Sequence, residues 1–188
     1  MKKTGLRLRK MDTFLQRLCV QKLYYEAFPA EERKPFGMIM KMRRKGRTDI
    51  WCIEADGKFA GFATTINGDG LVLIDYLAVA GGKRGEGIGS EGLQMLKKQY
   101  PGRGMFVEIE SVYEQGDNQG ERVRRKNFYI RNGMEELGVL ADVFGVQMEL
   151  LGWNCRLDFD GYQAFYREHY SSWAAGHLKY IEFPAQNN

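Results

Sequence analysis

The sequence predicts a mixed α/β fold in which helices cover both faces of a mostly antiparallel, twisted sheet. Segments 49–55 and 58–66 are rich in strand-forming residues and are joined by an Asp-Gly pair, a strong signal for a β-hairpin. Segment 71–79 continues this antiparallel series. It then runs into a glycine-rich turn, a helix over 87–99 and a strand over 105–110, and this strand–helix–strand order requires a parallel strand pair.

One strand and two helices precede these strands. Two leucines alternate with basic residues over 5–9, which predicts a short, half-exposed strand. A first helix begins after Asp12 or Thr13, either of which can cap it, and ends at Phe28-Pro29. A proline at the start and a glycine at the end predict a second helix over 35–46.

The C-terminal third adds further elements in the same pattern. A helix is predicted over 119–131, because Asn132-Gly133 is a good C-terminal stop. A late strand follows over 143–151, and a last helix over 160–169. No internal repeat, low-complexity tract or linker interrupts the chain.

Size and composition are those of one globular domain. The chain has 188 residues, 44% of them hydrophobic and 28% charged, which is enough for a substantial core. We therefore expect a single domain over 1–188, with a core over about 5–152 and a helical tail over 153–188. The formal charge of +4 suits an anionic ligand. Because the basic residues are scattered among acidic ones, we expect no nucleic-acid surface.

The cysteines and histidines indicate a reduced compartment and no metal site. Cys19, Cys52 and Cys155 are odd in number and far apart, so we expect reduced thiols that are buried as small apolar groups. His169 and His177 lack metal-ligand spacing. No stretch resembles a signal peptide or a membrane span, and we expect a cytoplasmic protein without a membrane partner.

The turn over 84–90 joins a strand directly to a helix and is the strongest candidate for a ligand site. Its glycines have neither the Gly-x-Gly-x-x-Gly spacing of a dinucleotide site nor the Gly-x-x-x-x-Gly-Lys of a P-loop. Arg84 and the positive end of the helix dipole favour an anion here. Four backbone amides can converge on phosphate oxygens: those of Gly85, Gly87, Gly89 and Ser90. The alternative is a tight turn that binds nothing.

Two segments together resemble the signatures of the GNAT superfamily of N-acyltransferases. The first is Leu77-Ala78-Val79 followed by Arg84-Gly85-Glu86-Gly87-Ile88-Gly89, which resembles the acyl-CoA signature. The second is residues 127–134, which carry an aromatic-Tyr-x-x-x-Gly pattern around Tyr129. The order of elements also matches, from about residue 5 to residue 152. The tail beyond it is not explained by the resemblance.

The resemblance implies acetyl-CoA as co-substrate, without a metal. The strand ending at Val79 would splay from the strand over 105–110, and its unpaired backbone groups would bind the pantetheine amides as an added strand would. The glycine turn would hold the pyrophosphate. The cofactor-binding residues implied are Leu77, Ala78, Val79, Arg84, Gly85, Glu86, Gly87, Ile88, Gly89, Ser90 and Tyr129. The resemblance also makes a homodimer plausible.

The implied catalytic residues are one phenol and a choice of carboxylates. Tyr129 is the candidate general acid, because a phenol stays protonated at neutral pH and can protonate the leaving thiolate; a core tyrosine is the alternative. Asp75 is the first candidate for the base and Glu110 the second. Glu108 lies on the same face of its strand as Glu110. For each carboxylate, the alternative is a surface or salt-bridged acid.

The chain departs from the common family pattern in the helix before Tyr129. Many members carry Asn seven residues and Ala four residues before the tyrosine, where this chain has Arg122 and Arg125. These arginines either reach the nucleotide phosphates or form a solvated helix face. A set of side chains from the first two helices and the loop between them either lines the acceptor site or belongs to the core: Tyr24, Tyr25, Phe28, Phe36, Met38 and Met42.

These observations predict an N-acetyltransferase that moves an acetyl group from acetyl-CoA to a primary amine. Direct attack in a ternary complex is expected, because no Cys or Ser lies beside a base as a nucleophile. The acceptor amine belongs to a small molecule, a peptide N-terminus or a lysine. The alternative function is a non-catalytic acyl-CoA-binding regulatory protein, which would need no Tyr129.

Overall fold

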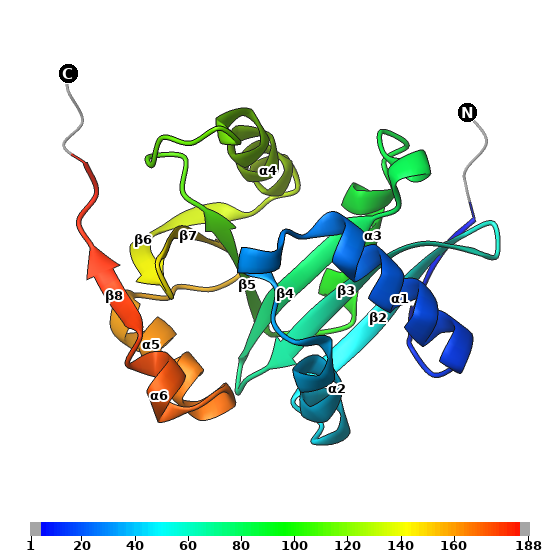
Figure 1. Ribbon diagram of the computed structural model, residues 1–188, viewed down its shortest axis with the longest axis horizontal. Helices are drawn as coiled ribbons and strands as arrows, with labels where there is room; N and C mark the ends of the chain where they lie inside the picture. Colours follow the sequence, from blue (N-terminus) through cyan, green and yellow to red (C-terminus); the bar gives the residue numbers. More distant parts are fainter. Residues whose placement is uncertain (1–4, 185–188) are drawn as a thin grey trace. The chain divides into compact units, whose positions relative to one another are not determined.

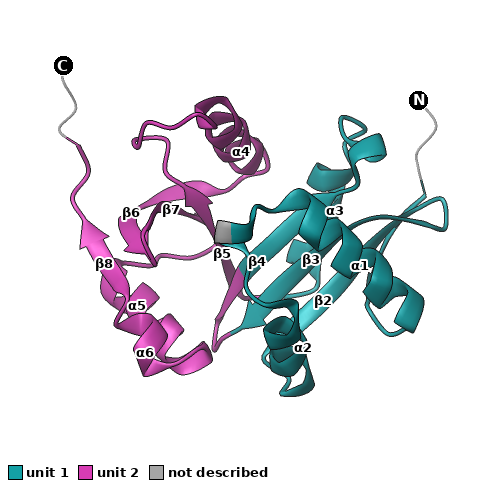
Figure 2. Cartoon of the chain, viewed as in Figure 1, with its two compact units in different colours: residues 1–67, 74–101 teal, residues 68–73, 102–188 magenta. Residues whose placement is uncertain are grey.

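The computed structural model describes residues 5–184 and divides the chain into two compact units (Figure 2). Unit 1 consists of Met1–Asn67 and Ile74–Pro101, and unit 2 of Gly68–Leu73 and Gly102–Asn188. One strand, β4, begins in unit 2 and continues into unit 1.

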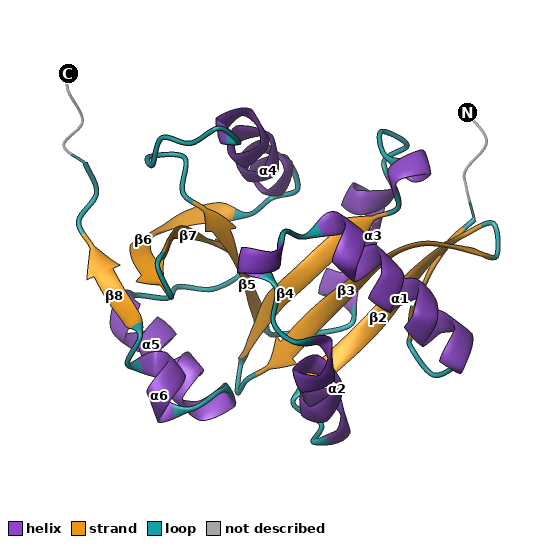
Figure 3. Cartoon of the chain, in the orientation of Figure 1, coloured by secondary structure: helices purple, strands orange, loops and turns teal. Residues whose placement is uncertain are grey.

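Unit 1 is a four-stranded sheet in the order β1-β2-β3-β4, with three helices (Figures 1 and 3). Its strands are β1 (Leu6–Lys10), β2 (Thr48–Ala55), β3 (Lys58–Asn67) and β4 (Leu71–Val79). Its helices are α1 (Phe14–Ala27), α2 (Phe36–Arg44) and α3 (Ile88–Lys98), with short 3-10 turns η1 (Ala30–Glu32) and η2 (Gly81–Lys83). The β1–β2 and β2–β3 pairs are antiparallel, which confirms the predicted hairpin.

Helices cover both faces of the unit 1 sheet. On one face, α1 and α2 pack against Ile50, Phe62 and Tyr76 in one buried cluster. On the opposite face, Ile88 at the start of α3 packs with Ile53 and other small and branched residues. Successive residues of β4 therefore alternate between two apolar layers, as a strand buried on both sides requires.

The start and end of α1 follow the predicted signals. The Thr13 side chain accepts a hydrogen bond from the Gln16 amide, and the Gln16 side chain accepts one from the Thr13 amide, which completes a capping box. The helix ends at Phe28, before Pro29. Tyr24, Phe28 and Phe36 pack with Phe62 and Tyr76, so these three side chains belong to the core, which was one of the two interpretations.

Unit 2 contains the strand order β5-β7-β6-β8 and three helices. Its strands are β5 (Gly104–Glu110), β6 (Glu135–Val143), β7 (Val146–Trp153) and β8 (Leu178–Ile181), and its helices are α4 (Gln119–Arg131), α5 (Phe159–His169) and α6 (Ser172–Ala175). The start of β4 also belongs here, and the Gly104 amide donates to the Gly70 carbonyl oxygen at 2.9 Å, where β5 begins beside it. The predicted mixed α/β class is confirmed.

The predicted strand over 143–151 was wrong in its N-terminal part. Two strands, β6 and β7, meet there in a tight turn at Phe144-Gly145, both with positive φ (55° and 90°). The Asp142 side chain accepts a hydrogen bond from the Gly145 amide at 2.9 Å and stabilises the turn. A Phe-Gly turn is not a typical hairpin signal, because a bulky residue rarely adopts positive φ.

The cysteines are all free thiols, but they differ in burial. Cys52 is buried and Cys155 is half-buried, whereas Cys19 is exposed, so the prediction of burial was wrong for Cys19. Within residues 5–184, no helix is both long and apolar enough to cross a membrane. The extent of a single domain over 1–188 stays a prediction.

Candidate active site

The glycine turn of unit 1 is exposed, and its backbone is open to a ligand. Gly85 and Gly87 have φ of 83° and 81°, a conformation that other residues rarely adopt, and Gly87 is the N-cap of α3. A Cβ atom added at either glycine would meet no heavy atom within 4 Å. Ile88 is only 1% exposed and anchors the start of α3 in the core. No heavy atom of the described residues therefore covers the Cβ positions of these two glycines, directly before α3.

The register of β4 directs two predicted backbone contacts away from β3. The Ala80 amide donates to the Ala60 carbonyl oxygen of β3 at 2.9 Å. Because backbone groups of alternate residues point to the same edge of a strand, those of Leu77 and Val79 point to the opposite edge of β4. The Arg84 side chain donates to the Val79 carbonyl oxygen at 3.4 Å, which agrees with this direction. Ala78 lies between them and is buried.

Asp75, the first candidate base, forms an ion pair within unit 1. The Lys34 Nζ lies 2.5 Å from Asp75 Oδ1, and the Asp75 side chain is only 6% exposed. Lys34 belongs to the loop between α1 and α2. Asp75 is therefore a salt-bridged acid in this structure.

Tyr129, the candidate acid, lies on α4 in unit 2 and is 6% exposed. Burial raises its pKa to about 12, although the nearby Arg125 guanidinium opposes this increase. Its hydroxyl donates to none of the described residues, while its ring contacts Phe128 edge-on at 5.0 Å. The phenol is thus protonated at neutral pH and keeps its proton available.

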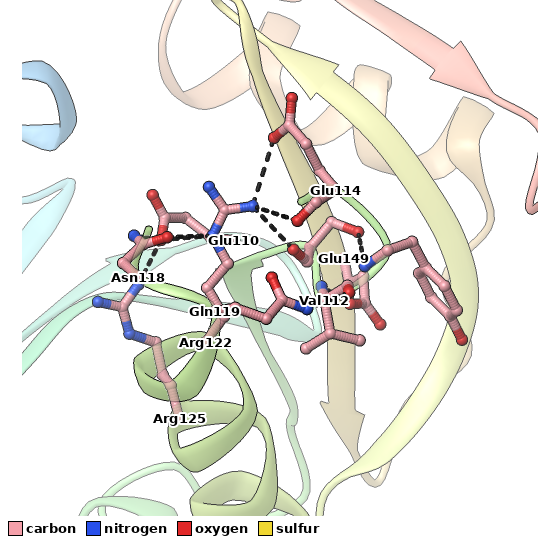
Figure 4. Close-up of polar contacts among 10 residues, drawn as sticks. Glu110, Val112, Glu114, Asn118, Gln119, Arg122, Arg125 and Glu149 are labelled. Carbon is pink, nitrogen blue, oxygen red and sulfur yellow. Dashed lines mark hydrogen bonds and ion pairs between the residues drawn. The ribbon is translucent and has the colours of Figure 1, made fainter. Parts of the chain in front are cut away.

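Glu110, the second candidate base, is held by a polar network between β5 and α4 (Figure 4). Its Oε2 accepts from Asn118 Nδ2 at 2.8 Å and lies 3.3 Å from Arg122 Nε and 3.8 Å from an Arg125 nitrogen. Glu110 is 7% exposed. Two guanidinium groups and one side-chain amide thus hold this carboxylate in place.

Arg122 neither reaches toward a nucleotide phosphate nor lies on a solvated helix face, which were the two interpretations of the sequence. It is 9% exposed, and its guanidinium donates to the Ser111 and Glu114 carbonyl oxygens, both at 3.1 Å, in addition to pairing with Glu110. It is therefore neither a solvated helix residue nor directed at a phosphate. Its side chain fixes the loop between β5 and α4 (Figure 4).

The same loop is held from β7 by a residue that sequence reasoning missed. Glu149 is 2% exposed, accepts from the Val112 amide at 2.7 Å and pairs with Lys126 Nζ at 2.6 Å. These bonds outweigh the burial of Lys126 and raise its pKa. An acidic residue within an otherwise apolar strand was the available signal, because such a residue is buried only with partners.

Glu108, the third carboxylate, is bound by the C-terminal tail. The hydroxyl of Tyr162, on α5, donates to Glu108 Oε1 at 2.6 Å, and Tyr162 is completely buried. Burial, followed by the Glu108 charge, raises the pKa of Tyr162 well above 10. The tail therefore contributes a polar contact to β5, a role that no sequence pattern indicated.

The predicted site residues thus fall into two groups, one in each unit. Unit 1 holds the glycine turn, the backbone of Leu77 and Val79, and Asp75, and unit 2 holds Tyr129 and Glu110. Their catalytic and cofactor-binding roles stay predictions. Within the described residues, no group of three or more His, Cys, Asp or Glu side chains is placed to hold a metal ion.

Known proteins resemble this chain in both sequence pattern and fold. The acetyltransferase (GNAT) family matches residues 17–128, more than half of the chain. No curated protein matches it by sequence. A GNAT-family structure from Bacteroides thetaiotaomicron is similar, with a TM-score of 0.69, 23% identity and coverage of 86% of this chain and 94% of that one.

Two further structures share the fold at lower identity. One is an aminoglycoside 6′-N-acetyltransferase in complex with coenzyme A (TM-score 0.63, 14% identity, 78% of this chain and 96% of that one). The other is a Salmonella typhimurium acetyltransferase that modifies the N-terminal serine of ribosomal protein L7/L12 (TM-score 0.60, 16% identity, 81% and 95%). With its glycine turn, its mixed sheet and the match over residues 17–128, this chain belongs to the acetyltransferase (GNAT) family.

Proposed function

We propose that this GNAT acetyltransferase transfers an acetyl group from acetyl-CoA to a primary amine by direct attack in a ternary complex. The observation that carries the proposal is the exposed turn at the start of α3. Its left-handed glycines, Gly85 and Gly87, leave the backbone open, so that a pyrophosphate can approach the amides of the first helical turn.

The donor would lie along the edge of β4 away from β3, which no other strand of unit 1 occupies. The backbone groups of Leu77 and Val79 point to this edge, so they can pair with the two amides of pantetheine as a neighbouring strand would. The pyrophosphate would bind at residues 84–90, next to the Arg84 guanidinium. The acyl group would then lie farther back along β4, toward Asp75.

The chemistry requires that the amine lose protons and that the leaving thiolate gain one. In this proposal Asp75 takes a proton from the acceptor ammonium, and the neutral nitrogen attacks the thioester carbonyl. Tyr129 donates its proton to the coenzyme A thiolate. Its pKa of about 12 supports this role, because the phenol is fully protonated at the start of each turnover.

The surroundings of the two carboxylates favour Asp75 over Glu110 as the base. Glu110 faces Arg122 and Arg125, and a guanidinium stays charged at any physiological pH. Asp75 faces a lysine, whose compact ammonium does not bind a carboxylate through a planar fork. Asp75 can therefore exchange its present cation for an acceptor amine more readily than Glu110 can.

The acceptor is proposed only as a class. The fold neighbours named above act on an aminoglycoside and on a protein N-terminus, so both small-molecule and peptide amines are candidates. We place the enzyme in the cytoplasm, in keeping with its free thiols. A homodimer is part of the proposal but not a requirement of the chemistry.

The test is a panel of amines with acetyl-CoA as donor, read out by thiol release and by mass spectrometry of the products. Aminoglycosides, polyamines, amino acids and short peptides with a free N-terminus make up the panel. We expect thiol release that depends on at least one amine. Binding of acetyl-CoA without turnover on any amine would favour the non-catalytic regulator instead.

A further inference from the structure

The Lys34 side chain lies where the proposed chemistry requires an amine. Its Nζ is 2.5 Å from Asp75 Oδ1, and the side chain is 25% exposed, so it is partly accessible from solvent. This amine therefore already contacts the carboxylate that we propose as the general base.

Lys34 is held at its backbone and at its ammonium group by contacts within unit 1. Its carbonyl oxygen accepts from the Tyr24 hydroxyl at 2.8 Å, and its amide donates to the Tyr76 hydroxyl at 3.1 Å. The Tyr76 hydroxyl in turn donates to the Glu32 carbonyl oxygen at 3.0 Å. The Nζ lies 5.7 Å from the centre of the Tyr76 ring, within the range of a cation–π contact. The position of this amine is thus determined by the fold.

The contacts of Lys34 show which edge of β4 it crosses. Tyr76 belongs to the apolar layer under α1 and α2, and its strand neighbour Asp75 points to the opposite face. Lys34 contacts both residues, so its side chain passes around an edge of the strand. Among the strands of unit 1, only β3 lies beside β4, so Lys34 crosses the edge of β4 away from β3, to which the backbone groups of Leu77 and Val79 point.

We propose that Lys34 is itself an acetyl acceptor, so that the enzyme acetylates its own α1–α2 loop. This inference rests on the proposed function, because it uses the same donor position and the same base. The edge that Lys34 crosses is the edge along which pantetheine would lie. The thioester would meet the Lys34 Nζ next to Asp75.

The reaction balances without any further reactant. Asp75 takes one proton from the Lys34 ammonium, and the nitrogen lone pair attacks the carbonyl carbon of the thioester. A nitrogen–carbon bond forms, and the carbon–sulfur bond breaks with its electron pair on sulfur. The nitrogen then loses a second proton. One proton goes to the coenzyme A thiolate and one to solvent, leaving acetyl-lysine and free coenzyme A.

Acetylation would change the site as well as the lysine. The amide product carries no charge, so the ion pair with Asp75 would be lost, while the backbone contacts of Lys34 with Tyr24 and Tyr76 would stay in place. The modification would therefore remove the positive charge of Lys34 that lies next to Asp75, the proposed base, without unfolding the loop.

The experiment incubates the full-length protein with acetyl-CoA and follows the intact mass, with peptide mapping to locate each acetyl group. Three variants accompany the wild type. Lys34→Arg keeps a cation at Asp75 but cannot accept the acetyl group in this way, and Asp75→Asn removes the base. Lys22→Arg is the control, because Lys22 is 78% exposed and reports non-specific acetylation. Circular dichroism checks that each variant is folded.

We expect one acetyl group at Lys34, formed at a rate that does not depend on protein concentration. Lys22→Arg should behave like the wild type, Lys34→Arg should gain no acetyl group at this position, and Asp75→Asn should be about a hundredfold slower. If the wild type acetylates amines of the panel but leaves Lys34 unmodified, self-acetylation is overturned and the proposed function stands. If titration calorimetry detects no acetyl-CoA binding, both are overturned.

Discussion

At the scale of one residue, the surroundings of Tyr129 suit the role of general acid that we propose for it. Burial raises its pKa to about 12, and the Arg125 guanidinium limits that increase. The same guanidinium would stabilise the phenolate that forms when Tyr129 gives up its proton. Arg125 also lies 3.8 Å from Glu110, so one cation is shared between the two.

Replacing Tyr129 with Phe should lower kcat by about 10²- to 10⁴-fold, because the thiolate would lose its proton donor. The affinity for coenzyme A should change little. Steady-state kinetics and titration calorimetry measure the two effects separately. Tyr180→Phe is a matched control, since Tyr180 is 54% exposed and lies on β8, outside the proposed machinery. Equal kcat values for the wild type and Tyr129→Phe would remove Tyr129 from the mechanism.

At the scale of elements, the turn before α3 depends on two left-handed glycines. Replacing Gly87 with Ala places a Cβ at φ 81°, which should cost about 1–2 kcal/mol in the free energy of unfolding. Coenzyme A binding should weaken too, because the relaxed backbone would no longer present its amides to the pyrophosphate. The control is Gly37→Ala within α2, where the added Cβ meets nothing within 4 Å and should stabilise the helix. Urea unfolding measures the change in stability, and calorimetry measures the change in affinity for coenzyme A. If Gly87→Ala bound coenzyme A as tightly as the wild type, the proposed role of this turn in binding the pyrophosphate would be contradicted.

Arg122 holds α4 to β5 and to the loop before it. Arg122→Met should lower the free energy of unfolding by about 3 kcal/mol, because Glu110 would stay buried with fewer partners. Arg124→Met on the same helix should change it by less than about 0.5 kcal/mol, since Arg124 is exposed. The double variant Arg122→Met with Glu110→Gln should recover part of the loss. Equal urea midpoints for the two single variants would show that the network contributes no stability.

The elements predicted correctly from the sequence are those for which a local residue pattern alone determines the conformation. The capping box of α1, the Asp-Gly hairpin and the glycine turn are local patterns, and all three lie where expected. The Phe144-Gly145 turn was missed, because its positive φ values are imposed by the β6–β7 pairing. The partners of Glu110 and Glu149 were also missed. Which distant side chain satisfies a buried charge depends on tertiary structure, and no spacing in the sequence contains it.

At the scale of the whole molecule, charge is divided between the two units. Basic residues outnumber acidic ones in unit 1, and the reverse holds in unit 2. Unit 1 contains the proposed site for the anionic coenzyme A, so the field favours its approach. Unit 1 also contains a half-buried polar junction at Asp49, whose carboxylate accepts from Lys10, Asn67 and Tyr100.

The hydrogen bonds at Asp49 lead to a prediction about how the free energy of unfolding changes at low pH. Burial alone would raise the pKa of Asp49, but the hydrogen bonds from Lys10, Asn67 and Tyr100 outweigh it, so the folded pKa is lower than the ordinary 3.8. Such a group contributes stability that is complete above about pH 4 and is lost as pH falls through the folded pKa. Urea unfolding should therefore show a larger deficit for Asp49→Asn at pH 7 than near about pH 3. An equal deficit at both pH values would contradict this role for Asp49.

Binding of coenzyme A at the turn before α3 is the step on which the proposed chemistry depends most. Calorimetric titration of coenzyme A into the folded wild-type protein tests this binding directly. We expect saturable binding of one coenzyme A per chain, weakened by added salt because the ligand is anionic. If the folded protein gave no heat of binding with coenzyme A at any of several temperatures, the proposed coenzyme A site at this turn would be contradicted.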